Sequence, residues 1–91
     1  MAQRLQDTDI QKKMATIPGW EQRGNEITRQ YRFSDFVAAM AFVNHVATLA
    51  EQMDHHPDIL IQYNKVRLTL STHSSGGLTD LDFTLAQRTD V

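Results

Sequence analysis

Asp54-His55-His56-Pro57 is the stretch at which this chain changes from helix to strand. Proline cannot continue a helix, and it biases the residue before it away from helical angles, so a helix that arrives here must end. Residues 36–53, upstream, contain neither glycine nor proline. Downstream, residues 59–63 and 66–72 are predicted as two strands joined by a tight turn at Asn64-Lys65. The stretch therefore predicts a domain that combines a long helix with an antiparallel hairpin.

The long helix at residues 36–53 carries an unusually broad apolar surface. Ser34 suits its N-cap, and Asp35 suits the positive end of its dipole. At 100° per residue, apolar side chains cover about half of its circumference. They form one stripe of Phe36, Met40, Val43, Ala47 and Ala50, widened by Phe42, Val46, Leu49 and Met53. A helix that covers one sheet needs a narrower stripe, so we expect a second contact with another helix or another subunit.

The remaining segments predict one more hairpin and two shorter helices. A strand at residues 20–23 and a strand at residues 26–33 flank the turn signal Gly24-Asn25. A helix capped by Asp7 or Thr8 runs to the Pro18-Gly19 stop. A last helix begins at Thr79, with Asp82 at the capping-box position. The element order is α-β-β-α-β-β-α, which predicts an α+β fold with an antiparallel sheet and helices on one face.

Length and composition limit the possible functions. The chain has 91 residues, so we expect a single domain over 1–91, with the polar segment 1–7 loose. A net charge of -2 with scattered basic residues gives no electrostatic footprint for nucleic acid. The chain has no cysteine and no apolar run long enough for a membrane span or a secretory signal. We therefore expect a cytoplasmic protein.

Three of the 4 histidines fall at two places, His55-His56 and His73. The hairpin between them is expected to bring His73 back toward the pair. Imidazoles titrate near neutral pH, so such a cluster is suited to proton transfer. The structural alternative is that histidines at a helix C-terminus interact with the negative end of its dipole. His45 falls on the polar side of the long helix and is interpreted as a solvated surface residue.

Other kinds of site are weaker hypotheses. Adjacent residues in an extended chain point to opposite sides, so His55 and His56 are poorly spaced to chelate one metal ion. Serines lie near His73, but the chain contains no Gly-x-Ser-x-Gly elbow. Trp20 is a candidate pocket wall and Asp82 a candidate acidic acceptor. Their structural alternatives are a core tryptophan and a helix cap. The residues thus favour a metal-free acid–base site without naming a substrate.

Several motifs together resemble the pterin-4a-carbinolamine dehydratase family. They are Glu51-Gln52-Met53-Asp54-His55-His56-Pro57-Asp58, Tyr63-Asn64-Lys65-Val66, Leu68-Thr69-Leu70-Ser71-Thr72-His73 and Gly77-Leu78-Thr79-Asp80-Leu81-Asp82. The similarity extends from about Leu5 to Ala86. It includes Trp20 and the start of the long helix at Phe33-x-Asp35-Phe36. The resemblance implies a four-stranded antiparallel sheet with helices on one side, in agreement with the element order.

The resemblance also implies an activity, the dehydration of 4a-hydroxytetrahydrobiopterin to quinonoid dihydrobiopterin and water. That reaction recycles the pterin used by aromatic amino acid hydroxylases, so a hydroxylase is an expected pathway partner. By family pattern, His55 and His73 act as acid and base and His56 mainly binds pterin. The other substrate-binding positions are Trp20, Asp54, Pro57, Thr72, Ser74, Ser75 and Asp82. No metal or other cofactor is implied.

Two function classes remain open at this point. The first is the dehydratase, as a homodimer or homotetramer. The second is a non-catalytic dimerisation or transcriptional coactivator module on the same scaffold, because some family members bind a transcription factor through the long helix. The presence of His55, His56 and His73 favours the first class.

Overall fold

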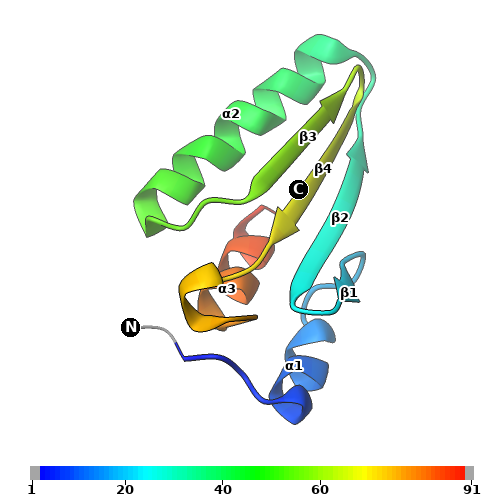
Figure 1. Cartoon of the computed structure of the whole chain (residues 1–91). Coiled ribbons are helices and arrows are strands. Elements are labelled where there is room, and N and C mark those ends of the chain that lie inside the picture. Colours follow the sequence, from blue (N-terminus) through cyan, green and yellow to red (C-terminus); the bar gives the residue numbers. More distant parts are fainter. Residues whose placement is uncertain (1–2, 90–91) are drawn as a thin grey trace.

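The computed structural model describes residues 3–89, which fold into a four-stranded antiparallel sheet with helices on one face (Figure 1). The elements are α1 (Asp7–Met14), β1 (Glu21–Arg23), β2 (Glu26–Arg32), α2 (Phe36–Met53), β3 (Asp58–Gln62), β4 (Lys65–Leu70), the 3-10 helix η1 (His73–Ser75) and α3 (Asp80–Arg88). The strand order is β1-β2-β4-β3. The predicted α+β class and order of helices and strands are confirmed.

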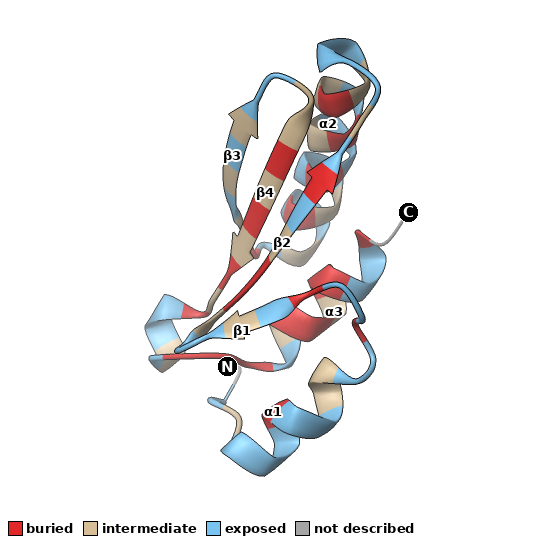
Figure 2. Ribbon diagram, turned by 90° about the vertical axis from the view of Figure 1, so that its right-hand side faces the viewer, coloured by how far each residue is buried: buried red, intermediate tan, exposed pale blue. Residues whose placement is uncertain are grey.

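Alternate residues of β4 face the core, as the alternation of apolar and polar residues in the sequence predicts. Figure 2 shows buried residues alternating with half-buried ones along β4. Val66, Leu68 and Leu70 are at most 1% exposed. Ile27 and Tyr31 of β2 are also buried. Together with side chains from the helices they form the core, which includes Ala39, Phe42, Val46, Ala50, Leu78, Phe83, Leu85 and Ala86.

The buried side of α2 differs from the predicted stripe. Ala39, Phe42, Val46 and Ala50 are the buried residues of α2, whereas Phe36 is 48% exposed. The shift arises because α2 contacts α3 as well as β4, so the side of the helix that faces both becomes the core side. Apart from Ala50, the predicted stripe therefore lies at the edge of the core and is partly open to solvent.

Two local boundaries also differ from the sequence expectation. Asp35, not Ser34, is the N-cap of α2, and its carboxylate accepts from the Ala38 N–H at 2.8 Å. The β3–β4 turn is at residues 63–64, not Asn64-Lys65, because Gln62 pairs with Lys65. The Asn64 side chain is fixed by donating to the Phe33 carbonyl at 3.0 Å, which sets this register.

The N-terminal segment is tied to the rest of the fold. Residues 1 and 2 lie outside the described residues, but the Leu5 N–H donates to the Leu78 carbonyl at 2.8 Å. Asp7 already belongs to α1, whose N-cap is Gln6 and which lacks a side-chain cap. The contact with Leu78 places this segment beside the loop that leads into α3.

Candidate active site

The C-terminus of α2 is closed by a backbone motif that separates the two adjacent histidines. Asp54 has φ 48° and ψ 45°, which is the left-handed region. Its N–H donates to the Glu51 carbonyl at 3.2 Å, and the His55 N–H donates to the Ala50 carbonyl at 3.0 Å. These two bonds define a Schellman motif, with Asp54 at the position that is usually glycine. After this reversal of the chain, the His55 side chain is 9% exposed and that of His56 is 56% exposed.

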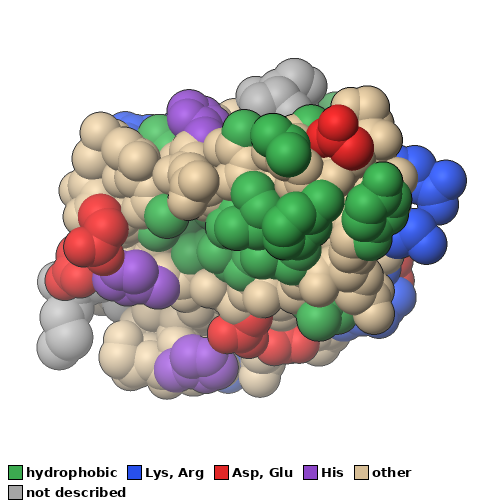
Figure 3. Space-filling view, turned by 90° about the horizontal axis from the view of Figure 1, so that it is seen from above, with side chains coloured by type: hydrophobic (Ala, Val, Ile, Leu, Met, Phe, Trp, Pro, Cys, Tyr) green, Lys and Arg blue, Asp and Glu red, His purple; other side chains and the backbone are tan. Residues whose placement is uncertain are grey.

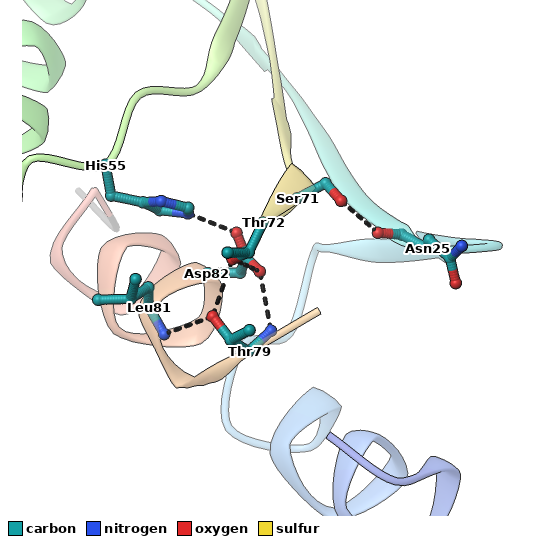
Figure 4. A network of polar contacts seen from close by, with 7 residues as sticks. All are labelled: Asn25, His55, Ser71, Thr72, Thr79, Leu81 and Asp82. Atoms are coloured by element: carbon teal, nitrogen blue, oxygen red, sulfur yellow. Dashed lines mark hydrogen bonds and ion pairs between the residues drawn. The ribbon is translucent and has the colours of Figure 1, made fainter. Parts of the chain in front are cut away.

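His55 is held by a buried carboxylate. Its Nε2 lies 2.6 Å from Oδ1 of Asp82, which comes from the first turn of α3 and is 0% exposed (Figure 4). An ionised carboxylate only accepts hydrogen bonds, so the proton between them belongs to Nε2 of His55. Nδ1 is then the ring nitrogen that remains for a ligand. A buried carboxylate is tolerated only when it is hydrogen-bonded, so this contact also satisfies Asp82.

The second oxygen of Asp82 is also fully used. Its Oδ2 accepts from the Thr72 hydroxyl at 2.9 Å and from the Thr79 backbone N–H at 2.9 Å. The Thr79 hydroxyl lies 2.8 Å from the Thr72 oxygen and accepts from the Leu81 N–H at 3.2 Å. This is the capping box of α3, as predicted. The Asp82 carboxylate, in the first turn of α3, therefore also fixes Thr72, just after β4, and the ring of His55.

His56 points to solvent and has a carboxylate of its own. Its Nε2 lies 2.5 Å from Oε2 of Glu51, one turn earlier in α2. Both side chains are more than half exposed, so solvent screens this pair. Sequence reasoning did not single out Glu51. The signal that could have found it is a carboxylate in the last helical turn directly before the histidine pair.

His73 begins η1 and is exposed. It lines an open hollow of about 400 Å³ with residues of the β1–β2 hairpin and of the following loop, namely Arg23, Asn25, Glu26, Ser71, Gly76 and Gly77. Ser71 turns away from Asp82 and donates to the Asn25 carbonyl at 2.7 Å. Thr72, between Ser71 and His73, is bonded to the carboxylate that holds His55. One hydrogen-bond network, centred on Asp82, thus joins the end of β4, the start of α3 and the end of α2.

The other predicted binding residues divide into surface and interior groups. Asp54 and Ser74 are exposed, and Pro57 and Ser75 are half-buried. Thr72 and Asp82 are buried, and their polar side-chain atoms are hydrogen-bonded to each other and to neighbouring residues. The geometry therefore does not support direct contact of Thr72 or Asp82 with a substrate, because their hydrogen-bonding positions are already occupied by His55 and by other protein groups.

Trp20, the predicted pocket wall, belongs to the core. It is 7% exposed, and its ring meets Tyr31 edge-on with centroids 6.5 Å apart. Among residues 3–89, its Nε1 has no hydrogen-bond partner and the indole is not joined to the histidine network. The alternative interpretation of a core tryptophan describes its surroundings better.

Two further observations concern the kind of site. Within the described residues, no group of three or more His, Cys, Asp or Glu side chains is arranged to hold a metal ion. Over the same part of the chain, no helix has the length and hydropathy needed to cross a membrane. The site contains two imidazoles after the C-terminus of α2, His55 and His56, each hydrogen-bonded to its own carboxylate. The third imidazole, His73, follows β4 at the start of η1.

Comparison with known proteins gives a consistent result. The family described as "Pterin 4 alpha carbinolamine dehydratase" matches residues 3–91. A provisionally named pterin-4-alpha-carbinolamine dehydratase of Chloroflexus aurantiacus is 53% identical over 96% of this chain and 94% of its own. A similarly named protein of Thermomicrobium roseum is 52% identical over 93% of this chain and 91% of its own.

Two solved structures share the fold. The transcriptional coactivator/pterin dehydratase from Brucella melitensis superposes with a TM-score of 0.91 at 36% identity and covers 94% of both chains. A pterin dehydratase-like protein identified as a RuBisCO assembly factor in the alpha-carboxysome gives a TM-score of 0.63 at 21% identity, over 77% of this chain and 81% of its own. The second likeness shows the fold alone.

Proposed function

Since the chain belongs to the pterin-4-alpha-carbinolamine dehydratase family, we propose that it dehydrates 4a-hydroxytetrahydrobiopterin to quinonoid dihydrobiopterin and water. In this reaction the bond from C4a to the hydroxyl oxygen breaks, and the hydroxyl leaves as water after receiving a proton. A ring nitrogen loses a proton, so the net change is the loss of one water. The observation that carries the proposal is the buried His55–Asp82 pair.

His55 and His73 are the proton-transfer residues of this proposal. With its Nε2 proton held by Asp82, His55 presents Nδ1 in a fixed orientation, which suits a general acid or base. His73 is exposed beside a hollow, where a substrate can reach it. General acid–base catalysis contributes about 10²–10⁴-fold, and imidazoles have pKa values near the working pH. His56, exposed and bonded to Glu51, mainly binds the pterin.

Thr72 and Asp82 are positioning residues rather than substrate contacts. Both are buried, and the Asp82 carboxylate touches His55 instead of the exterior. Asp54, Pro57, Ser74 and Ser75 remain the proposed substrate-binding positions, since they flank the histidines in the sequence and are exposed or half-buried. Trp20 acts on the site only through the packing of the core. No resident cofactor or metal takes part.

The chain is further proposed to act as one domain in the cytoplasm, as a homodimer or homotetramer. Figure 3 shows a hydrophobic patch on one face of the molecule. Among residues 3–89, the exposed large hydrophobic side chains belong to α2, β3 and the β3–β4 turn: Phe36 at 48%, Val37 at 75%, Leu60 at 51% and Tyr63 at 65%. Exposed apolar patches of this kind mark interfaces. After a separate two-electron reduction to tetrahydrobiopterin, the product would return to an aromatic amino acid hydroxylase as its pathway partner.

A second candidate function is a non-catalytic dimerisation or transcriptional coactivator module. The observation that favours it is the same apolar surface of α2, together with the name of the Brucella melitensis protein, which combines coactivator and dehydratase. A module without catalysis has no need for the buried His55–Asp82 pair. Its presence therefore favours the dehydratase.

The test is the decay of 4a-hydroxytetrahydrobiopterin with the purified protein, compared with the spontaneous rate. We expect His55→Ala and His73→Ala each to lower kcat, and His56→Ala to act mainly on KM. If His55 and His73 serve opposite faces of the ring, each single variant slows one 4a stereoisomer more than the other. The double variant His55→Ala with His73→Ala should then leave only the spontaneous rate for both. Near-normal turnover by the double variant would assign the proton transfers to other groups.

A further inference from the structure

Asp54 occupies a position that favours glycine or asparagine over aspartate. Its φ of 48° and ψ of 45° lie in the left-handed region, where glycine is the usual residue at a helix C-terminus. Its carboxylate lies at the negative end of the α2 dipole, and the last turn of α2 contains no basic residue. Asparagine adopts the same angles without a charge. Neither the backbone nor the dipole therefore explains a carboxylate here.

The Asp54 carboxylate is also unused by the chain. Its side chain is exposed, and within residues 3–89 it has no hydrogen bond or ion pair. The two neighbouring imidazoles have other partners, because His55 is bonded to Asp82 and His56 to Glu51. Asp54 thus keeps both carboxylate oxygens available, one residue away from the proposed catalytic His55.

We propose that the Asp54 carboxylate binds the donor edge of the pterin ring, where the N3–H and the 2-amino group lie side by side. Two parallel donors match the two oxygens of one carboxylate. C4a lies across the same six-membered ring from C2, so fixing this edge also fixes C4a relative to the imidazoles. This inference rests on the proposed function and deepens it, because it names the group that selects a 2-amino pteridine over its 2-oxo counterpart.

Binding of two non-reacting ligands tests the contact. The probes are 7,8-dihydropterin, and 7,8-dihydrolumazine, in which an oxygen replaces the 2-amino group. Hydrogen bonds to a charged group correspond to about a 10- to 100-fold change in affinity. We therefore expect Asp54→Asn to raise the Kd of dihydropterin about 10- to 100-fold and to raise that of dihydrolumazine less, because dihydrolumazine keeps the N3–H but lacks the 2-amino donor. Asp58→Asn, which removes another exposed carboxylate close in sequence, is the control and should leave both Kd values unchanged.

A second variant separates binding from folding. Asp54→Gly relieves the left-handed strain and removes the charge, so its Tm should rise while its affinity for dihydropterin falls. A destabilised variant would lose both, so opposite changes in Tm and affinity identify a residue kept for ligand binding. In turnover, we expect Asp54→Asn to raise KM more than it lowers kcat, since the donor edge does not react.

Three results would overturn the inference. One is that both Asp54 variants bind dihydropterin within about twofold of the wild type, a difference too small for a lost charged hydrogen bond. Another is equal weakening of both ligands, which would mean that Asp54 does not read the 2-amino group. The third is a wild-type protein that neither binds dihydropterin nor accelerates dehydration. That outcome would remove the proposed function as well, whereas the first two leave it intact.

Discussion

Replacing Asp82 by asparagine is the sharpest test of the buried network. The substitution keeps the size of the side chain but turns one acceptor oxygen into a donor amide. Facing Thr79, that amide would meet a backbone N–H, which is donor against donor. The favoured orientation therefore directs the amide toward Nε2 of His55. Nε2 must then accept, and the His55 proton moves to Nδ1, the nitrogen that is proposed to face the substrate.

The expected effects on rate and stability differ in size. A histidine held in the wrong tautomer loses its acid–base role, which is worth about 10²–10⁴-fold in kcat. Hydrogen bonds to a charged group contribute about 1.5–3 kcal/mol and neutral ones about 0.5–1.5, so the variant should lose only about 1–2 kcal/mol of stability. Domains of this size have about 5–15 kcal/mol, so it stays folded. Asp82→Ala would instead leave three buried groups unsatisfied, at about 1–3 kcal/mol each.

The assay combines stopped-flow dehydration kinetics with urea unfolding. Asp80→Asn is the matched control, because Asp80 lies two residues earlier in the same helical turn but is exposed and, within residues 3–89, is paired only with Lys13 at 3.0 Å. We expect Asp80→Asn to retain near-normal kcat and stability. If Asp82→Asn is folded and its kcat stays within about twofold of the wild type, far from the loss expected of an acid–base group, then Asp82 does not act through His55.

The remaining predictions concern assembly, metal and the second carboxylate. Ala47→Glu places a charge at an exposed position of the predicted α2 stripe and should lower the oligomer mass in sedimentation, whereas Thr48→Glu, outside that stripe, should not. A wild-type monomer at micromolar concentration would contradict the proposed assembly. Dialysis against a strong chelator should leave activity unchanged, and zinc-dependent recovery after dialysis would refute a metal-free mechanism. Glu51→Gln should raise KM more than it lowers kcat, because it loosens the ring of His56; a loss confined to kcat would assign that ring a proton-transfer role.

The order of elements could be predicted because each carries a local signal. Val66, Leu68 and Leu70 alternate with polar residues and are buried as the period of two requires. Pro57 ends α2, and Thr79 with Asp82 caps α3 through a spacing that is visible in the sequence. Such signals depend on a few consecutive residues, so tertiary structure does not need to be known to find them.

The contact side of α2 could not be predicted to the same precision. Half of its circumference is apolar, so the sequence allowed the buried centre to lie anywhere on a broad arc. The structure places it at Ala39 and Val46, both 0% exposed, because α2 packs against α3 as well as the sheet. Ala47, which belonged to the predicted stripe, is exposed. Only the positions of the neighbouring elements decide which part of such an arc is covered.

In the candidate site, the sequence identifies the histidines but not the residues that they contact. His55, His56 and His73 are identifiable from their type and from the hairpin between them. The partners of the first two are less accessible to sequence reasoning: Asp82 lies 27 residues from His55, and Glu51 lies on the helix before His56. Distant pairs such as His55 and Asp82 follow from the packing of α3 against the end of α2, which no local pattern specifies.

Asp82 also resolves an alternative that sequence reasoning presented as a choice. A helix cap and an acidic hydrogen-bond acceptor were two interpretations of one residue, and the structure shows both at once. The combination has a physical advantage. The capping box fixes the carboxylate through the Thr79 N–H, and Thr72 fixes it from the other side, so the oxygen facing His55 has little freedom. A base or acid is more effective when its orientation is set before the substrate arrives. The structural role of Asp82 at the start of α3 is thus the means by which it can position His55.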